Sequence, residues 1–125
     1  MKISHIGTVI VPVSDQDEAL AFYTQTLGFE TRIDGSFGEG QRWIEVAPPG
    51  AETSIALVPG GPSGGIEVSL ATGDAATDHA AMLAAGVDAD AELIEWEGVP
   101  PMFTFRDPSG NALRMVERGP AEEAS

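Results

Sequence analysis

Two charged side chains stand out because each lies in a predicted strand whose neighbouring residues are apolar. Glu67 alternates with the apolar residues of Ile66–Leu70, and Arg114 is out of step with its apolar neighbours in Leu113–Met115. Successive side chains of a strand point to opposite faces, so both charges lie opposite the apolar side chains. A carboxylate and a guanidinium in one half of the chain can form a charge-assisted pair. In the functional interpretation, Arg114 binds a ligand's carboxylate, enolate or phenolate, and Glu67 orients it or acts as a general base. In the structural alternative, the pair only satisfies two polar side chains.

Other common catalytic motifs are missing from the sequence. The chain has no cysteine, which excludes disulfides and thiolate chemistry, and it has no Gly-x-Ser-x-Gly nucleophile elbow. The Gly/Pro-rich run at 59–65 lacks the GxxxxGK[ST] pattern of a phosphate-binding loop and is interpreted as a flexible linker. The two histidines are expected to be a strand-end residue, His5, and a partly exposed helix residue, His79.

The charge balance excludes one large class of partner. Twenty acidic against six basic residues give a formal net charge of −14, which repels phosphate backbones, so nucleic acid is not an expected partner. The charge either serves solubility or steers a cationic ligand toward a cleft. No apolar run reaches the roughly 18 residues that span a bilayer, so no membrane partner is expected. The lack of a signal peptide and of cysteine predicts a cytoplasmic protein.

The best-marked element is a short amphipathic helix within Ser14–Phe29. Ser14 or Asp15 is the expected N-cap, and Gly28 supplies the left-handed residue that ends the helix. Its apolar face is predicted to consist of Leu20, Phe22, Tyr23 and Leu27. A second capped helix that ends at a glycine is predicted within Asp74–Val87, and it is expected to carry Ala76, His79, Ala80 and Leu83.

The order of the elements also repeats, which predicts an α+β fold made of two similar halves. Strands are predicted at residues 3–13, 29–37 with a turn at Gly35, 41–47, 53–58, 66–71, 87–95, 102–106 and 111–117. The chain therefore divides into module 1 (about 1–58), the linker (59–65), module 2 (about 66–118) and an acidic tail (119–125). Each module alone is too small to cover its own concave face, and pairing the two encloses a cavity.

Two motifs in the chain are distinctive. The first is Val-Pro-Val-Ser-Asp at 11–15 followed by Ala19-x-x-Phe22-Tyr23-x-x-x-Leu27-Gly28-Phe29, and the second is the turn Phe-Arg-Asp-Pro-Ser-Gly-Asn at 105–111. Together they resemble the vicinal oxygen chelate superfamily, which includes glyoxalase I, bleomycin-resistance proteins, fosfomycin-resistance enzymes and extradiol dioxygenases. The resemblance covers nearly the whole chain as a single domain, 1–125. It implies two βαβββ modules that form a cupped mixed sheet around a central cleft, in a homodimer.

Metal-dependent members of this superfamily place their ligands on the inward faces of four strands. In this sequence, the resemblance implies that the four ligand positions correspond to Thr8, Ala56, Glu67 and Arg114. A divalent metal needs three or more N, O or S donors in one place, and a guanidinium repels it. We therefore expect neither a metal site nor a cofactor.

The four strand positions are also candidate ligand contacts in the cleft. Further candidates, with core or interface packing as the alternative, are Trp43, Phe37, Met102 and Phe103. Trp96 is expected at the surface or at a dimer rim. The predicted function is metal-independent binding of a small organic molecule, of a sequestering or resistance type. The alternatives are a metal-dependent lyase, isomerase or dioxygenase, and a metal-free acid–base enzyme that uses Glu67 and Arg114.

Overall fold

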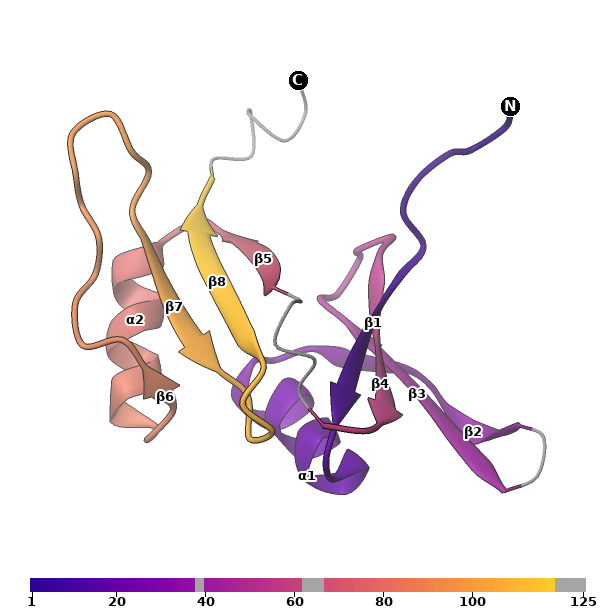
Figure 1. Ribbon diagram of the computed structural model, residues 1–125. Coiled ribbons are helices and arrows are strands. Elements are labelled where there is room, and N and C mark those ends of the chain that lie inside the picture. Colours follow the sequence, from indigo (N-terminus) through magenta and orange to yellow (C-terminus); the bar gives the residue numbers. More distant parts are fainter. Residues whose placement is uncertain (38–39, 62–66, 119–125) are drawn as a thin grey trace. The chain divides into compact units, whose positions relative to one another are not determined.

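Each half of the chain folds into a four-stranded mixed sheet with a helical segment on one face (Figure 1). The two compact units of this computed structural model are Met1–Gly64 and Gly65–Ser125. The residues that the structure describes are 1–37, 40–61 and 67–118. Most of the predicted linker and all of the predicted acidic tail lie outside the described residues. The two units repeat the predicted order of strand, helix and three strands.

The first sheet has the strand order β1-β4-β3-β2, with β1 parallel to β4 and the other pairs antiparallel. Its strands are β1 (Thr8–Val13), β2 (Glu30–Phe37), β3 (Gln41–Ala47) and β4 (Ser54–Pro59). β1 is shorter than the predicted strand at 3–13, because its partner β4 begins only at Ser54, opposite Thr8. β2 continues through Gly35, which pairs with Trp43, so the predicted turn at Gly35 is wrong.

The helical segment after β1 begins as α1 (Gln16–Ala21) and continues as a π-helical turn, η1 (Phe22–Thr26). Asp15, one of the two predicted caps, is the N-cap, and its carboxylate accepts a hydrogen bond from the Glu18 backbone N–H at 3.0 Å. Gly28 has a φ of +79° and follows the helix, as predicted. The π-helical turn was not predicted, because helical periodicity alone does not signal an inserted residue.

One polar side chain fixes α1 on its sheet. The side-chain amide of Gln16 donates to the carbonyl oxygens of Arg42 (3.0 Å) and Leu57 (2.9 Å), on two neighbouring strands. Tyr23 is the fully buried residue of the predicted apolar face, and Leu20, Phe22 and Leu27 are only partly buried. The sheet side chains of this core are Val11, Val13, Ile44, Val46, Ile55 and Leu57.

The second sheet has the order β5-β8-β7-β6, again with one parallel pair, β5 and β8. Its elements are β5 (Glu67–Thr72), α2 (Ala75–Ala84), β6 (Asp88–Ala89), β7 (Met102–Arg106) and β8 (Ala112–Glu117). β6 is much shorter than the predicted strand at 87–95. The chain leaves the sheet after Ala89 and returns at Ile94, whose backbone N–H and C=O both bond to Met102.

The buried face of α2 differs from the prediction. Asp74 caps the helix as expected, but the buried residues are Ala75, His79 and Met82, whereas Ala76, Ala80 and Leu83 are exposed. The prediction that His79 is partly exposed is therefore wrong. The His79 ring lies 4.8 Å from the Phe103 ring, and its Nε2 lies 2.8 Å from the Asp90 carbonyl oxygen. This histidine is a core residue with a satisfied polar atom.

The turn between β7 and β8 shows why the second sequence motif is needed for the fold. One carboxylate oxygen of buried Asp107 accepts from the backbone N–H groups of Ser109 (3.0 Å) and Asn111 (2.9 Å). Its other oxygen accepts from the Asn111 side-chain amide at 3.0 Å. Gly110, with a φ of +92°, closes the turn by donating to the Asp107 carbonyl oxygen. These residues act structurally, by aligning β7 with β8.

Candidate functional site

Glu67 and Arg114, the two charges singled out in the sequence, meet across the parallel strands β5 and β8. The Nε of Arg114 lies 3.0 Å from Oε1 of Glu67, and the two side chains are 43% and 46% exposed. Arg114 pairs in register with Ser69, so Glu67 is its diagonal neighbour on the same face. The structure thus brings the two residues together and leaves both open to solvent.

This pair lies on the face of the second sheet opposite α2. Phe103, which contacts His79 of α2, pairs with Met115, while Arg114 pairs with Thr104 on the alternate face. The apolar residues of β8 that face α2 are Leu113 and Met115, both buried. The alternation seen in the sequence therefore separates core side chains from the charged pair, as strand geometry requires.

Thr8 and Ala56 are diagonal neighbours across β1 and β4 in the first unit, just as Glu67 and Arg114 are across β5 and β8 in the second. Ala56 pairs in register with Ile10, so Thr8 lies two residues away on the same face of the parallel strands β1 and β4. Thr8 precedes the N-cap Asp15 by seven residues, and Glu67 precedes the N-cap Asp74 by the same number. The two units therefore place equivalent pairs of residues at equivalent points.

The residues at these four positions do not fit a divalent cation. Thr8 offers a hydroxyl, buried Ala56 offers only a methyl group, and the Glu67 carboxylate is neutralised by the guanidinium of Arg114. Within the described ranges, no group of three or more His, Cys, Asp or Glu side chains is arranged to hold a metal ion. His5 precedes β1, and its Nδ1 lies 3.8 Å from the exposed Glu52 carboxylate.

A second polar group, centred on Glu45 of β3, was missed by the sequence analysis. Oε2 of Glu45 accepts a hydrogen bond from the indole Nε1 of Trp43 at 2.7 Å, and Oε1 accepts from the hydroxyl of Ser54 at 2.7 Å. The hydroxyl of Thr8 lies 3.1 Å from that of Ser54 and extends the network to β1. Two of the predicted ligand contacts, Thr8 and Trp43, thus belong to this network.

Glu45 lies on the face of the first sheet opposite α1. Its strand neighbour Ile44 is fully buried, and Arg42, two positions from Ile44, forms an ion pair with Asp17 of α1 at 2.6 Å. The signal for Glu45 was therefore present in the sequence, because it alternates with Ile44 and Val46 just as Arg114 alternates with its neighbours. The hydrogen bonds from Trp43 and then Ser54 lower the pKa of Glu45, so it is a carboxylate at neutral pH.

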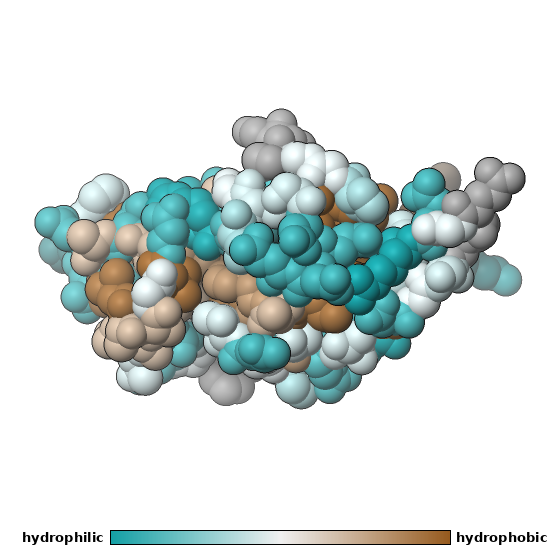
Figure 2. Space-filling view, turned by 90° about the horizontal axis from the view of Figure 1, so that it is seen from below, coloured by the Kyte–Doolittle hydropathy of each residue, from teal (hydrophilic) through white to brown (hydrophobic). Residues whose placement is uncertain are grey.

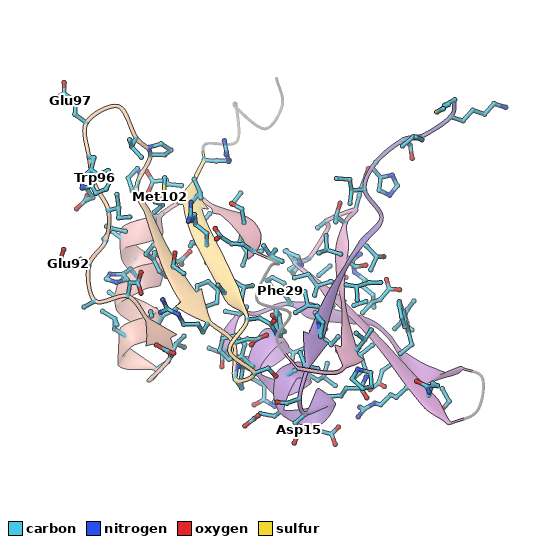
Figure 3. All side chains as sticks on the ribbon, viewed as in Figure 1. Asp15, Phe29, Glu92, Trp96, Glu97 and Met102 are labelled. Atoms are coloured by element: carbon cyan, nitrogen blue, oxygen red, sulfur yellow. The ribbon has the colours of Figure 1, made fainter. Side chains whose placement is uncertain are left out.

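The remaining predicted contacts fall in different places. Trp43 is partly buried beside Glu45, and partly exposed Met102 begins β7. Phe103 is 1% exposed and packs on His79 of α2, so it is a core residue rather than a ligand contact on the Arg114 face. The side chain of Phe37 lies outside the described part of the chain. Figure 3 shows exposed Trp96 on the loop before β7, between Glu92 and Glu97, consistent with the predicted surface position.

The surface combines polar side chains with paired charges. The face shown in Figure 2 is largely hydrophilic, with smaller hydrophobic areas between the polar side chains. Four of the arginines are paired with acids: Arg32 with Glu30, Arg42 with Asp17 and Asp34, Arg106 with Asp88 and Asp90, and Arg114 with Glu67. In the described part of the chain, no helix is both long and apolar enough to cross a bilayer.

Comparison with known proteins assigns the fold to a family. Residues 2–115 match the model of the Glyoxalase/Bleomycin resistance protein/Dioxygenase superfamily, so the chain belongs to this superfamily. The two four-stranded sheets described above are those of the glyoxalase/bleomycin-resistance fold, which confirms the fold predicted from the two motifs. The arrangement of the two units around a cleft stays a prediction.

Several solved structures are similar over nearly their whole length. TnmS3, an antibiotic binding protein from Streptomyces sp. CB03234, is 36% identical, with a TM-score of 0.83 over 95% of this chain and 99% of that one. A superfamily member from Sphaerobacter thermophilus DSM 20745 is 31% identical, with a TM-score of 0.85 over 94% of this chain and 100% of that one.

A shorter match is found among curated proteins. The uncharacterized protein YetH of Bacillus subtilis (strain 168) is 46% identical over 57 residues, which are 46% of this chain and 48% of that protein. This match therefore spans about half the length of the curated relative.

Proposed function

We propose that this protein binds a small organic molecule without a metal ion, as a sequestering or resistance-type member of its superfamily. The observation that carries the proposal is the Arg114–Glu67 ion pair, which occupies two of the four positions where metal-dependent members hold their cation. The similarity to TnmS3, an antibiotic binding protein, supports the same class of ligand. The ligand is thus proposed to be an antibiotic or a similar metabolite.

In this proposal Arg114 binds an acidic oxygen of the ligand. Its Nε faces Glu67, and among the described residues no other side chain forms an ion pair with it. The terminal N–H groups of a guanidinium can then form the two parallel hydrogen bonds that suit a carboxylate, enolate or phenolate. Glu67 holds the guanidinium in place. Thr8, Ala56, Trp43 and Met102 are proposed as further contacts.

The same pair also supports a catalytic alternative, in which Glu67 removes a proton from a ligand held by Arg114. In both cases we propose that the protein acts as a homodimer in the cytoplasm. The dimer is proposed from the resemblance to the superfamily, and the cytoplasmic location from the absence of cysteine. Sedimentation at the mass of one chain would contradict the dimer.

The experiment compares ligand binding with metal content in protein purified without a chelator. A thermal-shift screen of antibiotics, with bleomycin included, is followed by calorimetric titration of each compound that stabilises the protein. We expect saturable binding that survives treatment with EDTA and falls at least tenfold in Arg114→Met. Arg32→Met, which breaks an ion pair outside the site, is the matched control. Stoichiometric Ni, Zn, Fe or Mn that binding requires would overturn the proposal, and turnover of a bound compound would establish the catalytic alternative.

A further inference from the structure

Resting on the proposed function, we infer that Glu45 binds a positively charged nitrogen of the ligand. The ligand class would then be organic cations in which an amine, amidinium or guanidinium group is attached to a flat apolar body. The inference concerns the first unit alone, and Glu45 is not one of the four positions carried over from metal-dependent relatives. Its evidence is the geometry, the charge and the surroundings of the Glu45 carboxylate.

The carboxylate is held in one orientation before any ligand arrives. Its two oxygens are fixed separately, by the Trp43 indole N–H and by the Ser54 hydroxyl, each at 2.7 Å. Ser54 is itself 5% exposed and bonded to Thr8, so the donor cannot easily turn away. The Thr8 hydroxyl is a third hydrogen-bond donor to this carboxylate. A carboxylate has about four lone-pair sites, so these bonds leave about one for a ligand. The group is therefore preorganised to accept a further hydrogen bond.

Among the described residues of the first unit, Glu45 has no partner of opposite charge. The lysine and arginine side chains of that unit are Lys2, Arg32 and Arg42, and none of them forms an ion pair with Glu45. Its negative charge is stabilised by neutral donors only. Glu67, by contrast, is compensated by Arg114. A partly buried carboxylate with neutral donors attracts a cation more strongly than one already paired.

The surroundings of Glu45 favour an apolar body next to the cationic group. Ile33 pairs directly with Glu45 across β2 and β3, and Ala56 pairs with it across β3 and β4, so both side chains share its face. Ile10 pairs with Ala56 on the same face. Ile33 and Ile10 are 46% and 52% exposed, which is unusual for isoleucine in a sheet. Covering this surface would add hydrophobic stabilisation to the charge-assisted hydrogen bonds.

The test uses benzamidine and benzamide, which have nearly the same shape and differ in charge. Each is titrated into the isotope-labelled full chain, and backbone amide shifts are followed by NMR. We expect benzamidine to bind at least tenfold more tightly than benzamide and to shift amides of β3 and β4 around Glu45. Glu45→Gln should remove this preference. Glu52→Gln, which removes the same charge from an exposed loop, should keep it.

A further variant separates loss of charge from loss of structure. Glu45→Asp keeps the charge and should retain a preference for benzamidine, while Glu45→Gln should stay folded at neutral pH and unfold cooperatively in denaturant. Equal binding of both compounds by the parent protein, or an unchanged preference in Glu45→Gln, would overturn the inference. The proposed function is tested separately, because metal dependence and the effect of Arg114→Met do not involve Glu45. If the proposed function is wrong, only the metal-dependence and Arg114→Met measurements will show it.

Discussion

The Nε of Arg114 lies 3.0 Å from Oε1 of Glu67, across two parallel strands and on the face that no helix of its own unit covers. The two charges cancel each other, yet both side chains stay about half exposed. An electrically neutral pair that remains accessible can exchange part of its solvent shell for a ligand at low cost, whereas an unpaired arginine would have to be desolvated alone.

The Glu67–Arg114 pair should contribute little to stability. Exposed ion pairs are worth about 0.2–1 kcal/mol, because solvent screens them and both side chains lose freedom. A double-mutant cycle of Glu67→Gln and Arg114→Met, measured by urea denaturation, should give a coupling energy in this range. The Glu30–Arg32 pair, also partly exposed, provides the comparison. A coupling above about 2 kcal/mol would assign the pair a structural role instead.

The pH dependence of stability should carry a contribution from Glu45. Its pKa is lowered from the ordinary value of 4.5 by its hydrogen bonds in the folded protein, so the carboxylate stabilises the fold above that value. This contribution is lost as the pH falls through the lowered pKa of the folded state. The difference in unfolding free energy between the parent protein and Glu45→Gln should be constant from about pH 7 to about pH 5 and shrink below 4.5. Glu52→Gln controls for the general effect of removing one negative charge. If the difference in unfolding free energy between the parent protein and Glu45→Gln does not change with pH, this account is contradicted.

The turn at Asp107 should be one of the most sensitive polar positions. Asp107→Ala removes the acceptor of three hydrogen bonds in a buried turn and should lower the free energy of unfolding by about 2–3 kcal/mol. Asp107→Asn keeps one acceptor oxygen and should recover part of the loss. Asp88→Ala, at an exposed position, should change stability by less than about 1 kcal/mol. Chemical denaturation of the three variants tests the ranking, and an equal effect of Asp107→Ala and Asp88→Ala would contradict it.

The two histidines should differ sharply when replaced. His79→Ala removes a buried ring that packs on Phe103 and bonds to the Asp90 carbonyl, and should cost about 2–4 kcal/mol. His5→Ala changes an exposed side chain and should cost less than about 0.5 kcal/mol. Thermal unfolding of both variants measures the difference. Similar melting temperatures for the two would show that His79 is not a core residue.

Alternation within strands made most of the fold and one charged pair predictable. Glu67 and Arg114 were found because each breaks an apolar pattern, and the parity argument placed them on one face. Helix caps were equally clear, since Asp15 and Asp74 each accept a backbone N–H as expected. Local rules of this kind need only the sequence, because they depend on backbone geometry rather than on distant partners.

Features that depend on packing were harder to predict. The buried face of α2 was misassigned because alanines dominate the helix and give almost no contrast between its faces, so Met82 and Ala75 were overlooked. For Phe103 the sequence left both a pocket and the core open, since an aromatic residue suits either, and the structure places it in the core. The alternation around Glu45 was visible in the sequence, but its bond to Ser54 was not, because the register of β3 and β4 is fixed only in the folded sheet.

Every hydrogen-bonded ladder described above is completed within its own unit. Both neighbours of each central strand belong to the same half of the chain. Among the described residues, no strand of one half pairs with a strand of the other. A circular permutation that opened the chain at the Gly/Pro-rich segment would therefore leave every strand with its present neighbours. The strand pairing of either sheet therefore does not depend on the covalent connection between the two halves.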